Sequence, residues 1–201
     1  MKGLLRKELY LIWAYCRIFL LMIAVFIVAG ALGDQTDFMV VYPMVIGMIV
    51  AVSTLSYDER SKWNVACDTM PVSRARVVSS KYIVALGSVL VVFVLILIAQ
   101  GIRLTALGRL PELAHLPVKL LPLGLLGPAV LLPVMLALGV EKGRIIYFIA
   151  IGVVCALGVG MGKMPEAQLG TAPESLILML SCAIFAASWL LSIRLYEKRE
   201  L

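Results

Sequence analysis

The residues best suited to chemistry or binding are concentrated between positions 56 and 82, in a polar stretch between two apolar runs. Tryptophan and methionine side chains, surrounded by charges of both signs, are typical of a surface that docks another protein. The residues that we expect to contact a partner at this surface are Asp58, Glu59, Arg60, Trp63, Met70, Pro71 and Arg74.

The spacing of these residues predicts a rigid elbow of two helices rather than a loose linker. Trp63 and Met70 fall on one face of a short helix, and Asp58 and Glu59 are expected at its start, where acids suit the helix dipole. Pro71 ends this helix, and the following serine can cap a second one. The alternative is an interfacial helix resting on lipid, but an anionic leaflet would repel the acids, which favours a protein partner.

Sets of residues that could catalyse a reaction are hard to find in the sequence. The one histidine, His115, stands in a loop with no second metal ligand nearby. The glycine-rich stretch 158–163 fails as a phosphate loop, because Leu157 replaces the first glycine and Met164 replaces the magnesium-binding Ser or Thr. We therefore expect no enzymatic activity, no metal site and no bound cofactor in this chain.

The composition indicates an integral membrane protein. Of the 201 residues, 62% are hydrophobic and 15% are charged, whereas soluble domains carry about 25% charged residues. Six apolar runs approach the length of about 20 residues that spans a bilayer. These runs cover residues 18–32, 38–55, 83–99, 120–140, 145–161 and 175–193. The sequence predicts an all-α membrane protein of six transmembrane helices, forming a single domain over residues 1–201.

The distribution of positive charge predicts the orientation of these helices. Most of the 18 lysines and arginines fall at the two termini, in the 56–82 stretch and in the turn near residue 143, which alternation places on one side. The positive-inside rule assigns that side to the cytoplasm. The net charge of +6 is therefore a topology signal, and we expect no nucleic-acid partner.

Two further segments carry local predictions. Residues 1–17 have an apolar face and a basic face, which predicts an amphipathic helix in the cytoplasmic interface, although ordinary positive flanking sequence would look similar. We expect the first apolar run to extend backward through Trp13 and Tyr15. The fourth run contains several prolines, which predict a bent or broken helix.

The elbow resembles the cytoplasmic loop of bacterial ABC-2 type permeases, where an acidic pair and an aromatic residue precede a Leu-Pro-(Val)-Ser-Arg motif. Met70 stands where that family usually has leucine, and Lys7-Glu8 is similar to the family's opening. The residues that carry the resemblance are Asp58-Glu59, Trp63 and Met70-Pro71-Val72-Ser73-Arg74.

The resemblance implies the permease subunit of an ABC exporter in the bacterial cell membrane. Such a chain pairs with a second permease chain, here expected as a homodimer, and its coupling helix docks a cytoplasmic ATP-binding cassette subunit that holds ATP and magnesium. Its size and short outer loops look most like the exporters of phenol-soluble modulins, so the implied substrate is an amphipathic peptide or another hydrophobic molecule.

Two other functions are compatible with the residues. One is a carrier or channel that needs no ATPase, although the apolar runs have no charge near their centres for a coupling ion. The other is a membrane immunity protein that sequesters a toxic peptide without moving it. The elbow distinguishes an ABC exporter from both alternatives, because neither alternative needs a coupling element.

Overall fold

The structure is a computed structural model, and its described residues are helical or lie in short turns next to helices. They comprise residues 2–32, 37–63, 67, 73–108, 113, 115–139, 142, 143, 145 and 174–197. The long helices are α1 (Lys2–Tyr15), α2 (Arg17–Leu32), α3 (Asp37–Arg60), α5 (Arg74–Ala106), α6 (Leu116–Leu138) and α8 (Glu174–Glu197). The predicted all-α class is confirmed for this part of the chain.

Four of the described helices are long and apolar enough to cross a membrane: α3, α5, α6 and α8. The number rises to five if the bent pair α1 and α2 counts as one span. The predicted fifth run, residues 145–161, lies outside the described residues apart from position 145. The six-span prediction therefore stays a prediction.

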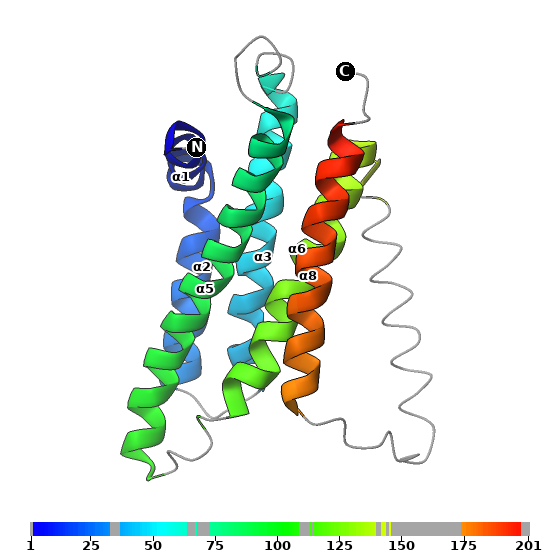
Figure 1. Cartoon of the computed structure of the whole chain (residues 1–201). Coiled ribbons are helices and arrows are strands. Elements are labelled where there is room, and N and C mark those ends of the chain that lie inside the picture. Colours follow the sequence, from blue (N-terminus) through cyan, green and yellow to red (C-terminus); the bar gives the residue numbers. More distant parts are fainter. Residues whose placement is uncertain are drawn as a thin grey trace.

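The N-terminal segment folds as the expected short helix, but it does not continue straight into the first apolar run. The axes of α1 and α2 differ by 72° across a break at Cys16. Helical hydrogen bonds continue on both sides of the corner, from Cys16 N to Ile12 O (2.9 Å) and from Leu20 N to Cys16 O (3.1 Å). Trp13 and Tyr15 belong to α1, which lies against α3 and α5, so the first apolar run does not extend backward through them as one straight helix (Figure 1).

Helix α3 is longer than the apolar run that predicted it. It continues through Asp58 and Glu59 and ends at Arg60, followed by a turn in which Lys62 has a positive φ of 53°. No proline or glycine lies between residues 48 and 60, so these three residues end α3 instead of heading a separate helix as expected. Helix α5 begins where predicted, after Ser73 at the N-cap, although the Ser73 side chain makes no capping bond.

Helix α6 is continuous from Leu116 to Leu138 despite its prolines, so of the predicted bend or break the break is excluded, and the bend stays a prediction. Pro117 lies in the first turn, where a missing N–H costs nothing. Between the inner prolines, Gly124 and Gly127 let the helix approach its neighbours closely: a Cβ atom at Gly127 would lie 2.0 Å from the sulfur of Met48 on α3. Tight packing against α3 and α8 supports the helix where backbone bonds are lost.

Two apolar clusters hold the bundle together, and α5 contributes to both. One cluster joins the ends of α3 and α5 to α6 and α8, around the buried Tyr82 and Leu132. The other joins α2 and α3 to the middle of α5, around the buried Met44 and Val89. Many large apolar side chains remain exposed on the outer faces of α2, α5 and α8, as expected for helices that face lipid.

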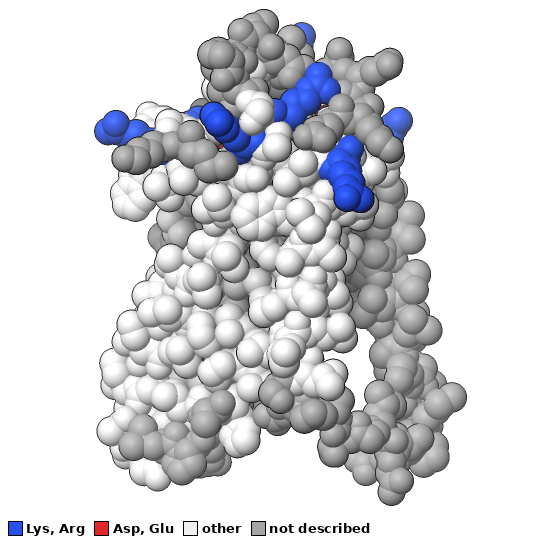
Figure 2. All heavy atoms as spheres, viewed as in Figure 1, with Lys and Arg blue, Asp and Glu red and all other residues white. Residues whose placement is uncertain are grey.

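One end of the bundle gathers the polar elements. Helix α1, the last turns of α3, α6 and α8, and the first turn of α5 all lie at this end (Figure 1). Figure 2 shows the lysine and arginine side chains of the visible face collected there, above a surface of uncharged residues. We call this the basic end of the bundle.

Candidate functional site

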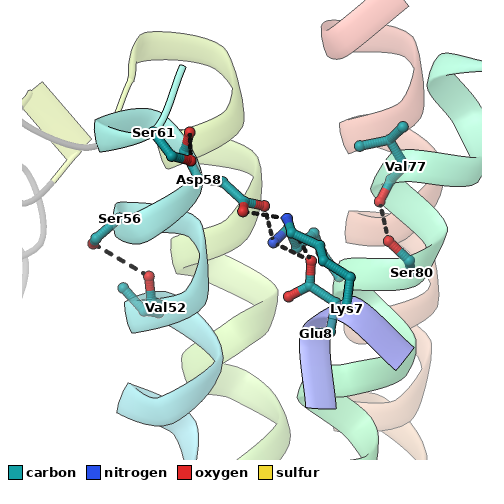
Figure 3. A network of polar contacts seen from close by, with 9 residues as sticks. Lys7, Glu8, Val52, Ser56, Asp58, Ser61, Val77 and Ser80 are labelled. Carbon is teal, nitrogen blue, oxygen red and sulfur yellow. Dashed lines mark hydrogen bonds and ion pairs between the residues drawn. The ribbon is translucent and has the colours of Figure 1, made fainter. Parts of the chain in front are cut away.

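Four charged side chains meet inside the basic end, and we call them the four-charge cluster: Lys7 and Glu8 from α1, Asp58 from α3 and Lys81 from α5 (Figure 3). The ammonium group of Lys81 lies 2.6 Å from Glu8 Oε1 and also donates to Asp58 Oδ2. Lys7 donates to Asp58 Oδ1 and lies 3.3 Å from Glu8 Oε1. Three helices distant in sequence are therefore tied together by charge-assisted hydrogen bonds.

The cluster is electrically balanced and almost completely enclosed. Glu8, Asp58 and Lys81 are only 1%, 2% and 3% exposed. Two cations face two carboxylates, so no net charge is buried, although Glu8 Oε2 is buried and has no hydrogen-bond partner among the described residues. Because an unpaired charge at such a depth costs several kcal/mol, each member of the cluster depends on the others. The cluster therefore holds α1 in place against α3 and α5.

Aromatic contacts extend the cluster toward the loop that joins α3 to α5. The Lys7 ammonium group lies 4.3 Å from the centre of the Trp63 ring, within the range of a cation–π interaction. Tyr15 of α1 stacks on Tyr57 of α3 with ring centres 4.5 Å apart. Helix α1 is thus held to the end of α3 and to the beginning of the loop by three kinds of contact.

A second polar network joins α5 to the other side of the bundle. The Tyr82 hydroxyl lies 2.8 Å from Ser188 Oγ and 2.7 Å from Ser192 Oγ, both on α8. Ser188 Oγ in turn donates to the backbone oxygen of Ala129 on α6. The Tyr82 ring also stacks on Trp189 with ring centres 5.6 Å apart. The first turns of α5 are therefore fixed to α6 and α8 as well.

Two neighbouring residues of α5 connect this helix to different parts of the bundle. Lys81 bonds to α1 and α3, and Tyr82 bonds to α8. Both lie within three turns of Arg74, where the chain leaves the loop. A displacement of the loop would therefore reach both halves of the bundle through this short segment.

The predicted docking residues fall into three groups. Asp58 lies in the four-charge cluster, with its carboxylate turned inward, while Glu59 and Arg60 are exposed at the end of α3. Trp63 and Arg74 are half-buried on the two sides of the loop. Met70 and Pro71 lie outside the described residues. Which of these residues touch a partner stays a prediction.

Sequence reasoning missed the cluster itself. The sequence indicates Lys7 only as part of a basic helix face and, with Glu8, of a family-like opening, and Lys81 only as one of the positive charges of residues 56–82. One signal was present: Glu8 follows Leu5 by three residues and precedes Ile12 by four, so an acid stands within the apolar stripe of α1. A charge in that position needs a partner from another helix.

Comparison with family models gives a match over residues 3–197, to the model described as ABC-2 family transporter protein. The chain belongs to the ABC-2 transporter family. Membership indicates a membrane-embedded permease subunit of an ABC transporter, and the family implies a cytoplasmic ATPase partner. The match runs from α1 to the last turn of α8, so the four-charge cluster lies within the ABC-2 region. Comparisons with curated proteins and with solved structures give no match.

Proposed function

We propose that this ABC-2 permease is the membrane subunit of an exporter in the bacterial cell membrane, with six spans and both termini in the cytoplasm. Two copies pair, and each docks an ATP-binding cassette subunit that binds ATP and magnesium. The proposed substrate is a hydrophobic or amphipathic molecule, and most simply a peptide, as in the phenol-soluble-modulin exporters that the sequence resembles. This chain itself carries out no chemical reaction.

The basic end supports the proposed orientation. Helix α1, the last turns of α3 and α8 and the first turn of α5 lie there, and the lysines and arginines visible in Figure 2 gather at the same end. Positive charge marks the cytoplasmic side of a membrane protein. On that side a soluble ATPase would reach the α3–α5 loop directly.

The four-charge cluster is the observation that carries the coupling role. The loop that would receive the ATPase is anchored on one side by Asp58 and on the other by Lys81, and these two residues bond to each other and to α1. A push on the loop therefore moves α3, α5 and α1 together instead of bending the loop alone. This is what a transmission element between a nucleotide-driven subunit and membrane helices requires.

The outer surfaces of the described helices support an apolar substrate. Charged residues of α5 and α8 stand near the helix ends, and their long middle segments are uncharged. A site in such surroundings would take hydrocarbon side chains more readily than charged groups. Lipids and hydrophobic drugs share that property, so the choice of peptide comes from the resemblance.

The test begins with purification of the tagged chain from its native membranes in mild detergent, followed by mass spectrometry of the proteins that accompany it. We expect a stoichiometric ATP-binding subunit that is lost when residues 58–74 are altered. A chain that repeatedly purifies alone would favour a carrier or an immunity protein instead.

Single substitutions then test the coupling itself. We expect Trp63→Ala and Pro71→Ala to leave folding and pairing intact while ATP hydrolysis no longer drives export. Trp13→Ala is the matched control, because Trp13 is 69% exposed on α1 and is absent from the predicted docking surface. Normal export by both elbow variants, at unchanged ATP cost, would show that the loop does not transmit the motion.

A further inference from the structure

An apolar cavity of about 420 Å³ lies beneath α1, between this helix and the bundle. It is almost three times as large as the engineered cavities of about 150 Å³ that bind benzene. Helices α1, α2, α3 and α5 all contribute to its wall. The lining includes Leu5 and Leu9 of α1, Leu20 of α2, and Gly87, Ser88 and Val91 of α5.

The chemistry of this wall selects a hydrocarbon chain. Among the described lining residues Ser88 has the one polar side chain, and the Ser88 hydroxyl is engaged with the backbone oxygens of Ala85 (2.9 Å) and Gly47 (3.3 Å). The lining therefore offers few hydrogen-bonding groups to the backbone of a bound peptide. Burying a peptide group without a hydrogen bond in an apolar environment costs several kcal/mol, so a peptide is disfavoured. Water is disfavoured for the same reason, because it needs two or more polar partners.

The cavity opens sideways, toward the lipid. Leu9 and Val91 line it and are nevertheless more than half exposed, which places them at its rim. Above it, α1 presents the exposed aromatic rings of Tyr10 and Trp13, and such rings favour the level of the lipid headgroups. The cavity thus lies at the depth where lipid chains begin.

Positive charge stands at the upper edge of this opening. Arg17, the first residue of α2, is exposed and precedes the cavity-lining Leu20 by three residues, so the two are neighbours on one helix face. Arg6 is exposed on α1 and precedes the lining residue Leu9 by three residues, so these two are also neighbours on one helix face. Both guanidinium groups suit a phosphate, which they can bind through two hydrogen bonds at once.

We infer that this cavity is a lipid site, which holds one acyl chain of an anionic phospholipid from the leaflet on the α1 side, with the phosphate near Arg6 and Arg17. The lipid fills the space between α1 and the bundle that the side chains leave open. It would support α1 from below, while the four-charge cluster holds the same helix from the bundle side.

Glycine positions on α5 provide a matched pair of variants. A Cβ atom at Gly87 would meet no heavy atom within 4 Å, and Gly87 lines the cavity, so Gly87→Leu places a large side chain inside it without a clash at the backbone. Gly101 is equally free of neighbours but is not part of the lining. Gly101→Leu therefore makes the same chemical change on the same helix outside the site.

The experiment uses the full chain in lipid nanodiscs containing phosphatidylglycerol with a photoreactive diazirine near the end of one acyl chain. After illumination, we expect crosslinks on peptides that carry the lining residues, reduced at least fivefold by Gly87→Leu and unchanged by Gly101→Leu. Crosslinks at these peptides that Gly87→Leu does not reduce would overturn the site. So would labelling spread evenly over the outer faces of α5 and α8.

A second arm tests the headgroup. The same diazirine chain on phosphatidylcholine should label the lining several-fold less than phosphatidylglycerol, and the double substitution Arg6→Gln and Arg17→Gln should abolish this preference. Equal labelling by both lipids in the unaltered protein would overturn the anionic assignment. Displacement of the lipid probe by an amphipathic peptide, with the peptide itself crosslinked at Gly87, would identify a substrate site instead and refute the lipid proposal.

Discussion

Replacement of Lys81 by methionine should destabilise the protein severely, because it removes the cation that bonds to both buried carboxylates. Methionine keeps the approximate length and apolar stem of lysine, so packing changes little. Glu8 and Asp58 would then share Lys7 alone. The cluster would change from neutral to a net charge of −1 at a site where both acids are at most 2% exposed.

The expected magnitude follows from burial and from the contacts that remain. Removing one partner of a buried ion pair costs about 3–5 kcal/mol. The lower end applies here, because the Lys7 side chain is 24% exposed and admits some water to the cluster. For a protein of about this size, 3 kcal/mol corresponds to a decrease of about 6–12 °C in the unfolding midpoint.

A double-mutant cycle tests the electrostatic explanation directly. Glu8→Gln removes one negative charge, so the combination of Lys81→Met with Glu8→Gln leaves Lys7 paired with Asp58 and restores neutrality. We expect the double variant to be more stable than the sum of the single effects by about 0.5–3 kcal/mol. The assay is equilibrium unfolding in mixed detergent micelles, with the thermal midpoint as a second measure.

The control is Arg76→Met, which removes an exposed positive charge from the same helix. It should change the midpoint very little. The reasoning is refuted if Lys81→Met is no more harmful than Arg76→Met. It is also refuted if the effects of Lys81→Met and Glu8→Gln simply add, because independent sites would not form a cluster.

Two further substitutions test the packing of the bundle, each by unfolding in micelles. Tyr82→Phe keeps the ring on Trp189 but removes the hydroxyl that joins α5 to α8, and should lower the free energy of unfolding by about 1–2 kcal/mol. An unchanged free energy of unfolding would show that the two serines find other partners. Gly124→Ala places a Cβ atom 2.8 Å from Cγ1 of Val89, whose β-branched side chain is stiff, and should destabilise by about 1–3 kcal/mol. Gly101→Ala meets open space and should be neutral or stabilising by up to about 1 kcal/mol, so equal effects at the two glycines would contradict the packing.

Hydropathy was sufficient to predict most of the described helices. The runs 83–99 and 120–140 lie largely within α5 and α6, because about 20 apolar residues in a membrane have no alternative to a helix. The same signal could not locate helix ends. Helix α3 continues past its apolar run to Arg60, since the polar residues that follow include no glycine or proline to end the helix.

The contacts of the candidate site were harder to predict than its position. The polar stretch between the second and third runs was recognised as unusual from its residue types. The partners of Asp58 were not, because Lys7 is 51 residues away and Lys81 is 23 residues away along the chain. Such pairs depend on how α1 folds back across the bundle. The sequence does not predict the 72° corner at Cys16, because no proline or glycine stands next to it.

The positions of the four-charge cluster along the chain have a consequence for folding during translation. Its members are synthesised in the order Lys7, Glu8, Asp58 and Lys81, and 73 residues separate Glu8 from Lys81. At about 5–20 residues per second, Glu8 is made about 4–15 s before its closest counter-charge. During that interval α1 lacks its strongest anchor, so its final docking must await insertion of α5. Helix α1 therefore reaches its final position late, although it is translated before α3 and α5.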